Sequence, residues 1–224
     1  MPRPIRQDLP DLLLLAAAEA FAAQGLHGAS LDAIAERLGV TKGAVYFHFR
    51  SKLELFHAAL DRLEQLKDEV LTEAMAEAQD RPAEALEAML GARLRFGLAH
   101  PELRRLHWIL DTELGSEVSG VLKGGVRAEH RRLRAELRTL LQRASRLGQV
   151  QMTDPAAEAF RLAAALEGTL SLHQAGPDDV ALFLDPEALV RSWLAPIRLR
   201  RGRRPAPSES PAEEPGGEDF QPAF

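Results

Sequence analysis

The sequence predicts an all-α fold, and three observations lead to that expectation. The chain of 224 residues is 46% hydrophobic, which is enough for a core, but only 5% aromatic. Its composition favours Ala, Leu, Glu and Arg, which are strong helix formers. Apolar residues recur every three or four positions along most of the chain, as they do in helices that bury one face. We expect about nine helices.

The clearest pair of helices begins at Ser30. Ser30 is a favourable N-cap, and apolar residues at helical spacing continue from it to Leu38. Gly39 suits a sharp turn, and the hydroxyl of Thr41 can cap a second short helix over residues 42–48. This pattern predicts a helix-turn-helix.

The second of these helices has an outer face that suits DNA. Val45 and Phe49 share one side by their spacing and are expected to pack inward. The other side carries lysine, which neutralises phosphate, and apolar groups that can meet thymine methyl groups. No acidic residue occurs from Arg37 to Leu53, so we expect a positive local field. The outward residues are Lys42, Gly43, Ala44, Tyr46, Phe47 and His48.

The segment GVTKGAVYFHFRSKLEL resembles the recognition-helix signature of the TetR (tetracycline-repressor) family of bacterial transcription regulators. The resemblance covers the first fifth to quarter of the chain, and the remainder only by helix layout. Phe47 stands where the family often has tyrosine, and Arg50 occupies a variable position where it can add a phosphate contact. The residues that the resemblance assigns to phosphates are Ser30, Thr41, Tyr46, His48 and Lys52. Those that it assigns to bases are Lys42, Gly43, Ala44 and Phe47.

We expect three parts in the chain. Residues 1–52 form a three-helix helix-turn-helix DNA-binding domain, and residues 53–200 a larger helical domain for effector binding and dimerisation. Residues 201–224 are rich in Pro, Glu, Ser and Gly and are expected to be a disordered tail. The basic run over residues 198–204 either contacts DNA or is a solvated helix end.

Further helices are predicted on both sides of the helix-turn-helix. Ser51 can cap a long fourth helix, which would connect the recognition helix mechanically to the second domain. The segment 115–125 is either a loop or a broken helix start. The first helix is expected from Asp8 or Asp11 to about Gln24, and the later ones over residues 82–100, 101–114, 126–147, 154–174 and 185–199.

The last two predicted helices carry more apolar surface than one core can cover. The helix that begins at Asp154 is apolar on nearly every side. We therefore expect a homodimer that forms through residues 154–199. Such a dimer would place two recognition helices in successive major grooves of a near-palindromic operator, about one helical turn apart.

Four residues of the second domain are candidates for an effector pocket: Phe96, His107, Trp108 and His130. Small-molecule sites combine apolar walls with a few polar groups, which these residue types provide. The alternative is that they fill a core. The family resemblance implies a small hydrophobic effector that releases a repressor from double-stranded DNA, and a constitutive regulator without an effector is the alternative function.

Several other classes of protein are disfavoured. The chain has no cysteine, which excludes disulfides, thiolate catalysis and cysteine-based zinc sites. Glu54 and His57 have di-iron spacing, but a second such unit is missing, so we expect no metal, no cofactor and no catalytic residue, and a helical-bundle enzyme is kept only as an alternative. The net charge of −5 argues against general coating of nucleic acid. Because the apolar run over residues 12–18 is flanked by acids, we expect a cytoplasmic protein without a membrane span.

Overall fold

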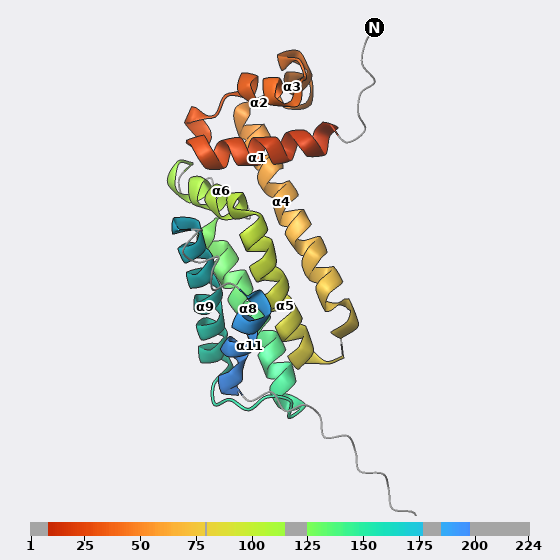
Figure 1. Cartoon of the computed structure of the whole chain (residues 1–224), viewed down its shortest axis with the longest axis vertical. Coiled ribbons are helices and arrows are strands. Elements are labelled where there is room, and N and C mark those ends of the chain that lie inside the picture. Colours follow the sequence, from red (N-terminus) through yellow and green to blue (C-terminus); the bar gives the residue numbers. More distant parts are fainter. Residues whose placement is uncertain (1–8, 79, 115–124, 177–184, 198–224) are drawn as a thin grey trace, which may run out of the picture.

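The computed structural model describes residues 9–78, 80–114, 125–176 and 185–197, and every regular element in these ranges is a helix (Figure 1). The all-α prediction is confirmed. The nine α-helices of the described ranges are α1 (Leu9–Gly28), α2 (Leu31–Leu38), α3 (Lys42–His48), α4 (Lys52–Met75), α5 (Pro82–Ala99), α6 (Pro101–Thr112), α8 (Val126–Arg146), α9 (Pro155–Ala175) and α11 (Pro186–Leu194). Two short 3-10 turns follow α4 and α11, at Ala76–Ala78 and Ala195–Ile197.

Helices α1, α2 and α3 and the first half of α4 enclose a hydrophobic core at one end of the molecule (Figure 1). Phe21 of α1 and Phe56 of α4 are fully buried there and meet edge to face, with ring centroids 5.3 Å apart. Ile34 of α2 and Val45 of α3 are buried in the same core. The two short helices are therefore held on a platform made by α1 and α4.

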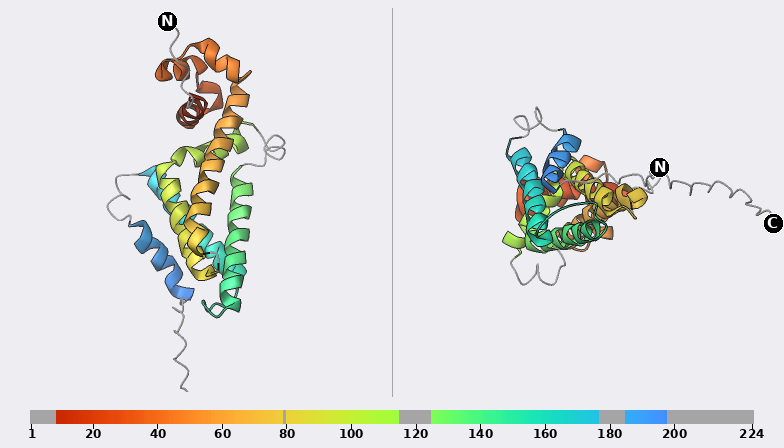
Figure 2. Two further views of the ribbon diagram at one scale, coloured as in Figure 1. Left: turned by 90° about the vertical axis from the view of Figure 1, so that its right-hand side faces the viewer. Right: turned by 90° about the horizontal axis from the view of Figure 1, so that it is seen from below.

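Helix α4 runs from this first core into the second domain (Figure 2). It has 24 residues, which corresponds to roughly 36 Å at 1.5 Å per residue. Its buried residues do not follow one straight apolar stripe, because Leu53 and Val70 are more than a third exposed, while Lys67 is buried. The reason is that α4 packs against α1 at one end and α5 at the other, so its buried face rotates along its length.

The second core lies among α5, α8, α9 and α11. Leu90 of α5, Leu137 and Leu141 of α8 and Leu162 of α9 are fully buried in it. Helix α6 behaves differently, because its residue Leu106 belongs to the first core. The core of the N-terminal helices thus extends beyond residue 52, and the boundary placed there stays a prediction.

Most predicted helix ends agree with the structure to within a few residues. Gly25 has φ 73° and ψ 173°, so it breaks α1 at the predicted place, and one further turn follows. The predicted helix over residues 185–199 is shorter, because α11 ends at Leu194 and Pro196 lies in the following 3-10 turn. The predicted tail, the basic run and nearly all of the segment 115–125 lie outside the described residues.

Helix α1 is long and apolar enough to span a membrane by length and composition, and it is the one such helix in the described ranges. The helix contains the acids Asp11 and Glu19, and the expected absence of a membrane span stays a prediction. Its side chains explain the composition in another way, because Leu13, Ala17 and Phe21 are buried in the first core. A core helix near an N-terminus meets the same criteria of length and hydropathy.

Candidate nucleic-acid interface

Side-chain caps fix the geometry of the helix-turn-helix. Ser30 Oγ accepts a hydrogen bond from the Ala33 N–H at 3.4 Å, and Thr41 Oγ1 accepts one from the Ala44 N–H at 3.2 Å. Gly39 ends α2 with φ 66°, a left-handed conformation that residues with a Cβ rarely adopt. The predicted helix-turn-helix is confirmed, with both caps and the turn at the predicted residues.

Helix α3 buries one side and presents the other to solvent. Val45 is fully buried and Phe49 partly buried. On the opposite side Phe47 is 85% exposed and Tyr46 45% exposed. The Phe47 ring stands nearly perpendicular to the His48 ring, with centroids 5.3 Å apart. Helix α3 lies at the tip of the molecule (Figure 1). Because burial of such a ring would stabilise the fold, its exposure on this helix fits a contact surface.

The lysine of this face is engaged within the protein. Lys42 Nζ lies 2.7 Å from Asp32 Oδ2, and both side chains are 58% exposed. The same ammonium lies 5.8 Å from the centroid of the Tyr46 ring. The hydrogen bond to Asp32, together with the charge of that carboxylate, raises the pKa of Lys42. An exposed pair of this kind is weak, so Lys42 can exchange Asp32 for another acceptor.

The other predicted DNA-binding residues surround α3 and the start of α4. Lys52 Nζ donates to the His27 carbonyl oxygen at 2.8 Å and so joins α4 to the last turn of α1. Ser51 caps α4 as predicted, and the Glu54 carboxylate accepts from the Arg50 N–H at 2.7 Å, one residue before the N-cap. Arg50, His48, Gly43 and Lys52 are exposed or half-exposed, so they are accessible on or beside the α3 face.

The positive field around α3 is weaker than expected. Arg37 Nη1 lies 2.9 Å from the Glu19 carboxylate, and its other terminal nitrogen donates to the Ala16 carbonyl. Lys42 is paired with Asp32. Two of the four basic residues in the acid-free stretch are thus neutralised by acids that the fold brings in from other positions. Asp32 was missed as a site residue, because its contact joins two helices and has no periodic signal.

A second candidate site lies among α5, α6, α8 and α9, where a cavity of about 390 Å³ is found. All four residues predicted for an effector pocket, Phe96, His107, Trp108 and His130, line this cavity. Two of them do not fill a core, because Trp108 is 54% exposed and the side chain of His130 is 41% exposed. Whether they bind an effector stays a prediction.

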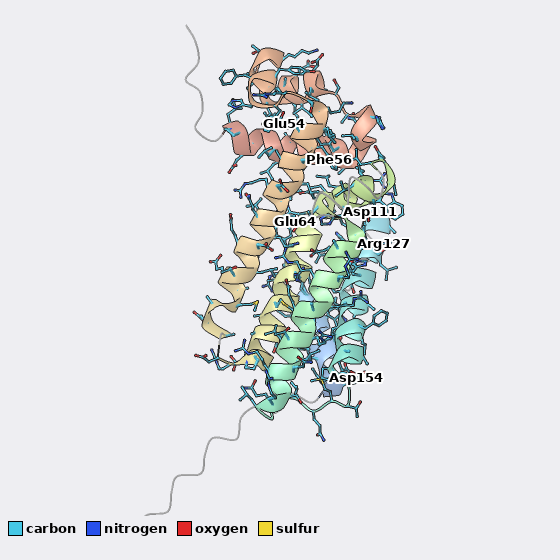
Figure 3. The ribbon with its side chains drawn as sticks, turned by 180° about the vertical axis from the view of Figure 1, so that it is seen from behind. Glu54, Phe56, Glu64, Asp111, Arg127 and Asp154 are labelled. Carbon is cyan, nitrogen blue, oxygen red and sulfur yellow. The ribbon has the colours of Figure 1, made fainter. Side chains whose placement is uncertain are left out.

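A buried charged network adjoins the cavity. Glu64 of α4, visible near the middle of the molecule in Figure 3, accepts from Lys67 at 2.7 Å and lies 2.6 Å from His107 Nε2. Glu129 of α8 accepts from Lys67 and Arg93 at 2.9 and 2.8 Å. Burial alone would raise the pKa of Glu64, but the hydrogen bonds with His107 and Lys67 lower it to about 2. The network joins α4 to α5, α6 and α8.

Comparisons with known proteins agree with this geometry. Residues 13–59 match the family model for bacterial regulatory proteins of the tetR family. The chain is 28% identical over 192 residues to the probable HTH-type transcriptional regulator ArpR of Pseudomonas putida. The aligned residues make up 84% of this chain and 90% of ArpR. The chain belongs to the tetR family. It is therefore a helix-turn-helix, DNA-binding transcriptional regulator and not an enzyme.

Other similar proteins and solved structures differ in how much of this chain they match. The HTH-type transcriptional activator FasR of Mycolicibacterium smegmatis is 54% identical over 50 residues, which are 22% of this chain and 23% of FasR. SmeT, the repressor of the Stenotrophomonas maltophilia multidrug efflux pump SmeDEF, is 25% identical over 92% of this chain and 96% of its own, with a TM-score of 0.60. A SmeT–triclosan complex, at 24% identity, has a TM-score of 0.63 over 93% and 100% of the two chains.

Proposed function

We propose that this tetR-family regulator is a cytoplasmic homodimer that represses transcription at a near-palindromic operator and is released by a small hydrophobic effector. The observation that carries the DNA-binding part is the outer face of α3. Phe47, 85% exposed, stands beside Lys42 and Tyr46 on a helix that Val45 anchors from beneath. The name of SmeT as a repressor supports the direction of regulation.

The proposed DNA contacts divide by chemistry. Lys42 can donate to base edges, while Gly43 and Ala44 lack bulky side chains and let the backbone of α3 approach the groove. Phe47 can contact the methyl group of thymine. The phosphates are bound around this helix, where they fix its position without reading sequence. The proposed phosphate ligands are Ser30, Thr41, Tyr46, His48, Arg50 and Lys52.

The proposed dimer forms through residues 154–199, and α9 supplies its apolar surface. Leu162 and Leu166 of α9 are buried in the second core. On the same helix Phe160 is 61% exposed and Leu172 is 66% exposed. A second copy of the chain, related by a two-fold axis, would cover these side chains and set the distance between the two α3 helices.

Helix α6 provides a route from the proposed effector site to α3. Leu106 and Ile109 are fully buried in the first core, together with the helix-turn-helix. His107 and Trp108 of the same helix line the cavity. A ligand that displaces α6 therefore acts directly on the platform beneath α3. To weaken DNA binding a hundredfold, the ligand must prefer the released state by about 2.7 kcal/mol.

Selection of bound fragments from a random DNA library tests the DNA-binding part. The full-length protein is expected to enrich two inverted half-sites with centres about one helical turn apart, bound by two subunits. The mass of the complex in solution gives the stoichiometry, and Phe160→Glu is expected to abolish the dimer and the two-site binding. Enrichment of a single half-site by a monomer would overturn the dimeric proposal.

The effector part needs a separate measurement. A thermal-shift screen with hydrophobic small molecules is expected to find ligands that raise the melting temperature with concentration. The same ligands should release a fluorescent operator in an anisotropy assay. Ligands that bind without changing DNA affinity would favour a constitutive regulator, and release of the operator would exclude it.

A further inference from the structure

The charged groups that line the cavity between α5, α6, α8 and α9 are mostly basic. Among the described residues, the lining includes two carboxylates, those of Glu129 and Glu167. Four lysine or arginine side chains and four imidazoles also line it. These basic side chains are Lys67, Arg93, Arg104, Arg105, His100, His107, His130 and His173.

Both carboxylates already have partners from the protein. Glu129 Oε1 accepts from Lys67 Nζ at 2.9 Å and from Arg93 Nη1 at 2.8 Å. Glu167 Oε2 lies 3.2 Å from Arg104 Nη1 and 3.4 Å from His130 Nε2. A cationic ligand would have to displace one of these protein cations, so the lining offers it no open counter-charge.

The polar atoms that lack partners lie on the basic side chains. The Arg93 side chain is 5% exposed, and its Nε is buried without a hydrogen-bond partner in the described part of the chain. His173 Nδ1 is likewise buried and unpartnered there. Arg105 is exposed and has no ion pair within the described ranges. An arginine Nε–H can only donate, and a buried donor without an acceptor is unfavourable, so this site lacks an acceptor.

The remaining walls of the cavity are apolar. Phe96, Leu103, Leu166 and Leu170 contribute side chains from α5, α6 and α9, and Trp108 stands half-exposed beside them. The volume of about 390 Å³ lies near the lower end of the range usual for small-molecule sites. A ligand that fits must therefore be compact and largely apolar, with few polar atoms.

We infer that the cavity binds a compact amphipathic carboxylate, an aromatic or aliphatic body that carries one anionic group. The apolar walls take the body, and the carboxylate supplies acceptor oxygens to Arg93 Nε and to the Arg105 guanidinium. Charge-assisted hydrogen bonds of this kind are about twice as strong as neutral ones. This inference rests on the proposed effector function and names the chemical class of the effector.

Three probes of one shape test the inference by calorimetry on the full-length protein. They are 2-naphthoate, 2-naphthamide and 2-naphthylmethylammonium, which are anionic, neutral and cationic. The acid is expected to bind at least about tenfold more tightly than the amide, and the ammonium more weakly still. Equal or tighter binding of the amide or the ammonium would overturn the carboxylate assignment, and so would the absence of binding by all three.

Two variants locate the charge that is responsible. Arg105→Gln is expected to weaken naphthoate binding about fivefold or more and to leave naphthamide nearly unchanged. Arg93→Lys keeps a positive charge but removes the buried Nε–H, so it is expected to lower the preference for the acid over the amide. The matched control is Arg127→Gln at the start of α8 (Figure 3), because Arg127 is exposed and does not line the cavity. Equal losses in Arg105→Gln and Arg127→Gln would show that only net charge matters and would overturn the site.

DNA release by the same probes separates this inference from the proposed function. If the bound amide or ammonium releases the operator, the ligand-responsive function is supported but the preference for a carboxylate is contradicted. Bound naphthoate that leaves operator affinity unchanged would support the anion site and contradict the effector function. Both readouts use the same protein and the same operator fragment, so the two failures can be told apart.

Discussion

Lys42 of α3 and Asp32 of α2 form an ion pair of 2.7 Å across the helix-turn-helix, although the sequence between them contains two helix ends and a turn. Lys42 belongs to the proposed base-reading set, so this carboxylate competes with DNA for the same ammonium. In the free protein Asp32 holds Lys42 on the outer face of α3. When DNA binds, it must either displace the Asp32 carboxylate from Lys42 or tolerate that negative charge close to its own phosphates.

Asp32→Asn is expected to tighten binding to DNA of any sequence by about threefold to tenfold, because a competing and repelling charge is removed. The melting temperature should change little, since the pair is more than half exposed. Fluorescence anisotropy with operator and random DNA measures the effect. The matched control is Glu73→Gln, an exposed acid in the distal half of α4. An equal gain in that variant would show that net charge, and not this contact, is responsible.

Phe47→Ala is expected to reduce discrimination between the operator and a scrambled sequence by about tenfold, because the apolar contact with a base is lost. The free energy of unfolding should change little, because the ring is 85% exposed and supports no core. Competition binding measures the ratio of the two affinities. Unchanged discrimination in Phe47→Ala would remove Phe47 from the base-reading set.

The salt dependence of DNA binding reports the number of phosphate contacts. The charged members of the proposed phosphate set, Arg50 and Lys52, give roughly four contacts on two subunits and a slope of log affinity against log salt of about −4. Lys52→Ala should weaken binding to all sequences alike and make the slope shallower by about 2 for the dimer. Titrations at several salt concentrations test this, and a slope near zero in the native protein would contradict the proposed phosphate set.

Interactions within a few residues were predictable from the sequence. The caps at Ser30 and Thr41 and the turn at Gly39 depend on local backbone geometry, which residue type specifies directly. The inward and outward sides of α3 were also predictable, because Val45 and Phe49 share a helical face and leave Phe47 outside. The helix-turn-helix was predicted well for this reason.

Contacts between distant residues were not predictable. The pairing of Arg37 with Glu19 depends on how α2 crosses α1, and the burial of Lys67 depends on acids from α4 and α8. Arg93 is enclosed between the carboxylates of Glu129 and Glu136, which lie more than 30 residues away in the sequence. The chemical type of the cavity residues makes them candidates in the sequence, but the packing of four helices brings them together.

Stability in acid is expected to depend on Glu64. The pKa of this group is lowered from 4.5 to about 2 in the folded protein, so its ionised form stabilises the fold above pH 4.5. That contribution, on the order of 2–3 kcal/mol, is lost as the pH falls from 4.5 to 2. Glu64→Gln should lower the free energy of unfolding at pH 7. It should also make the free energy of unfolding fall less steeply between pH 4.5 and pH 2. Urea unfolding at several pH values measures both, with Glu73→Gln as the exposed control.

The contact between Glu113 and Leu26 is expected to transmit the effector signal. Glu113, directly after α6, accepts a hydrogen bond from the Leu26 N–H at 2.9 Å. Gly25 makes this approach possible, because a Cβ there would lie 2.8 Å from Glu113 Oε1. The end of the helix that lines the cavity is thus attached to the last turn of α1, which Lys52 joins to α4 through His27.

Glu113→Ala leaves the Leu26 N–H without this acceptor and is expected to lower the free energy of unfolding by about 1–2 kcal/mol. DNA affinity without effector should stay within about twofold, because no proposed DNA contact is removed, whereas effector binding should weaken DNA affinity less than in the native protein. Thr112→Ala is the matched control, since its hydroxyl donates to the Trp108 carbonyl within its own helix and not to α1 in the described part of the chain. Anisotropy titrations with and without a ligand found in the thermal-shift screen measure the coupling. A full effector response in Glu113→Ala would show that the signal does not need this contact and passes instead through the packing of Leu106 and Ile109 in the first core or through the buried charges of α4.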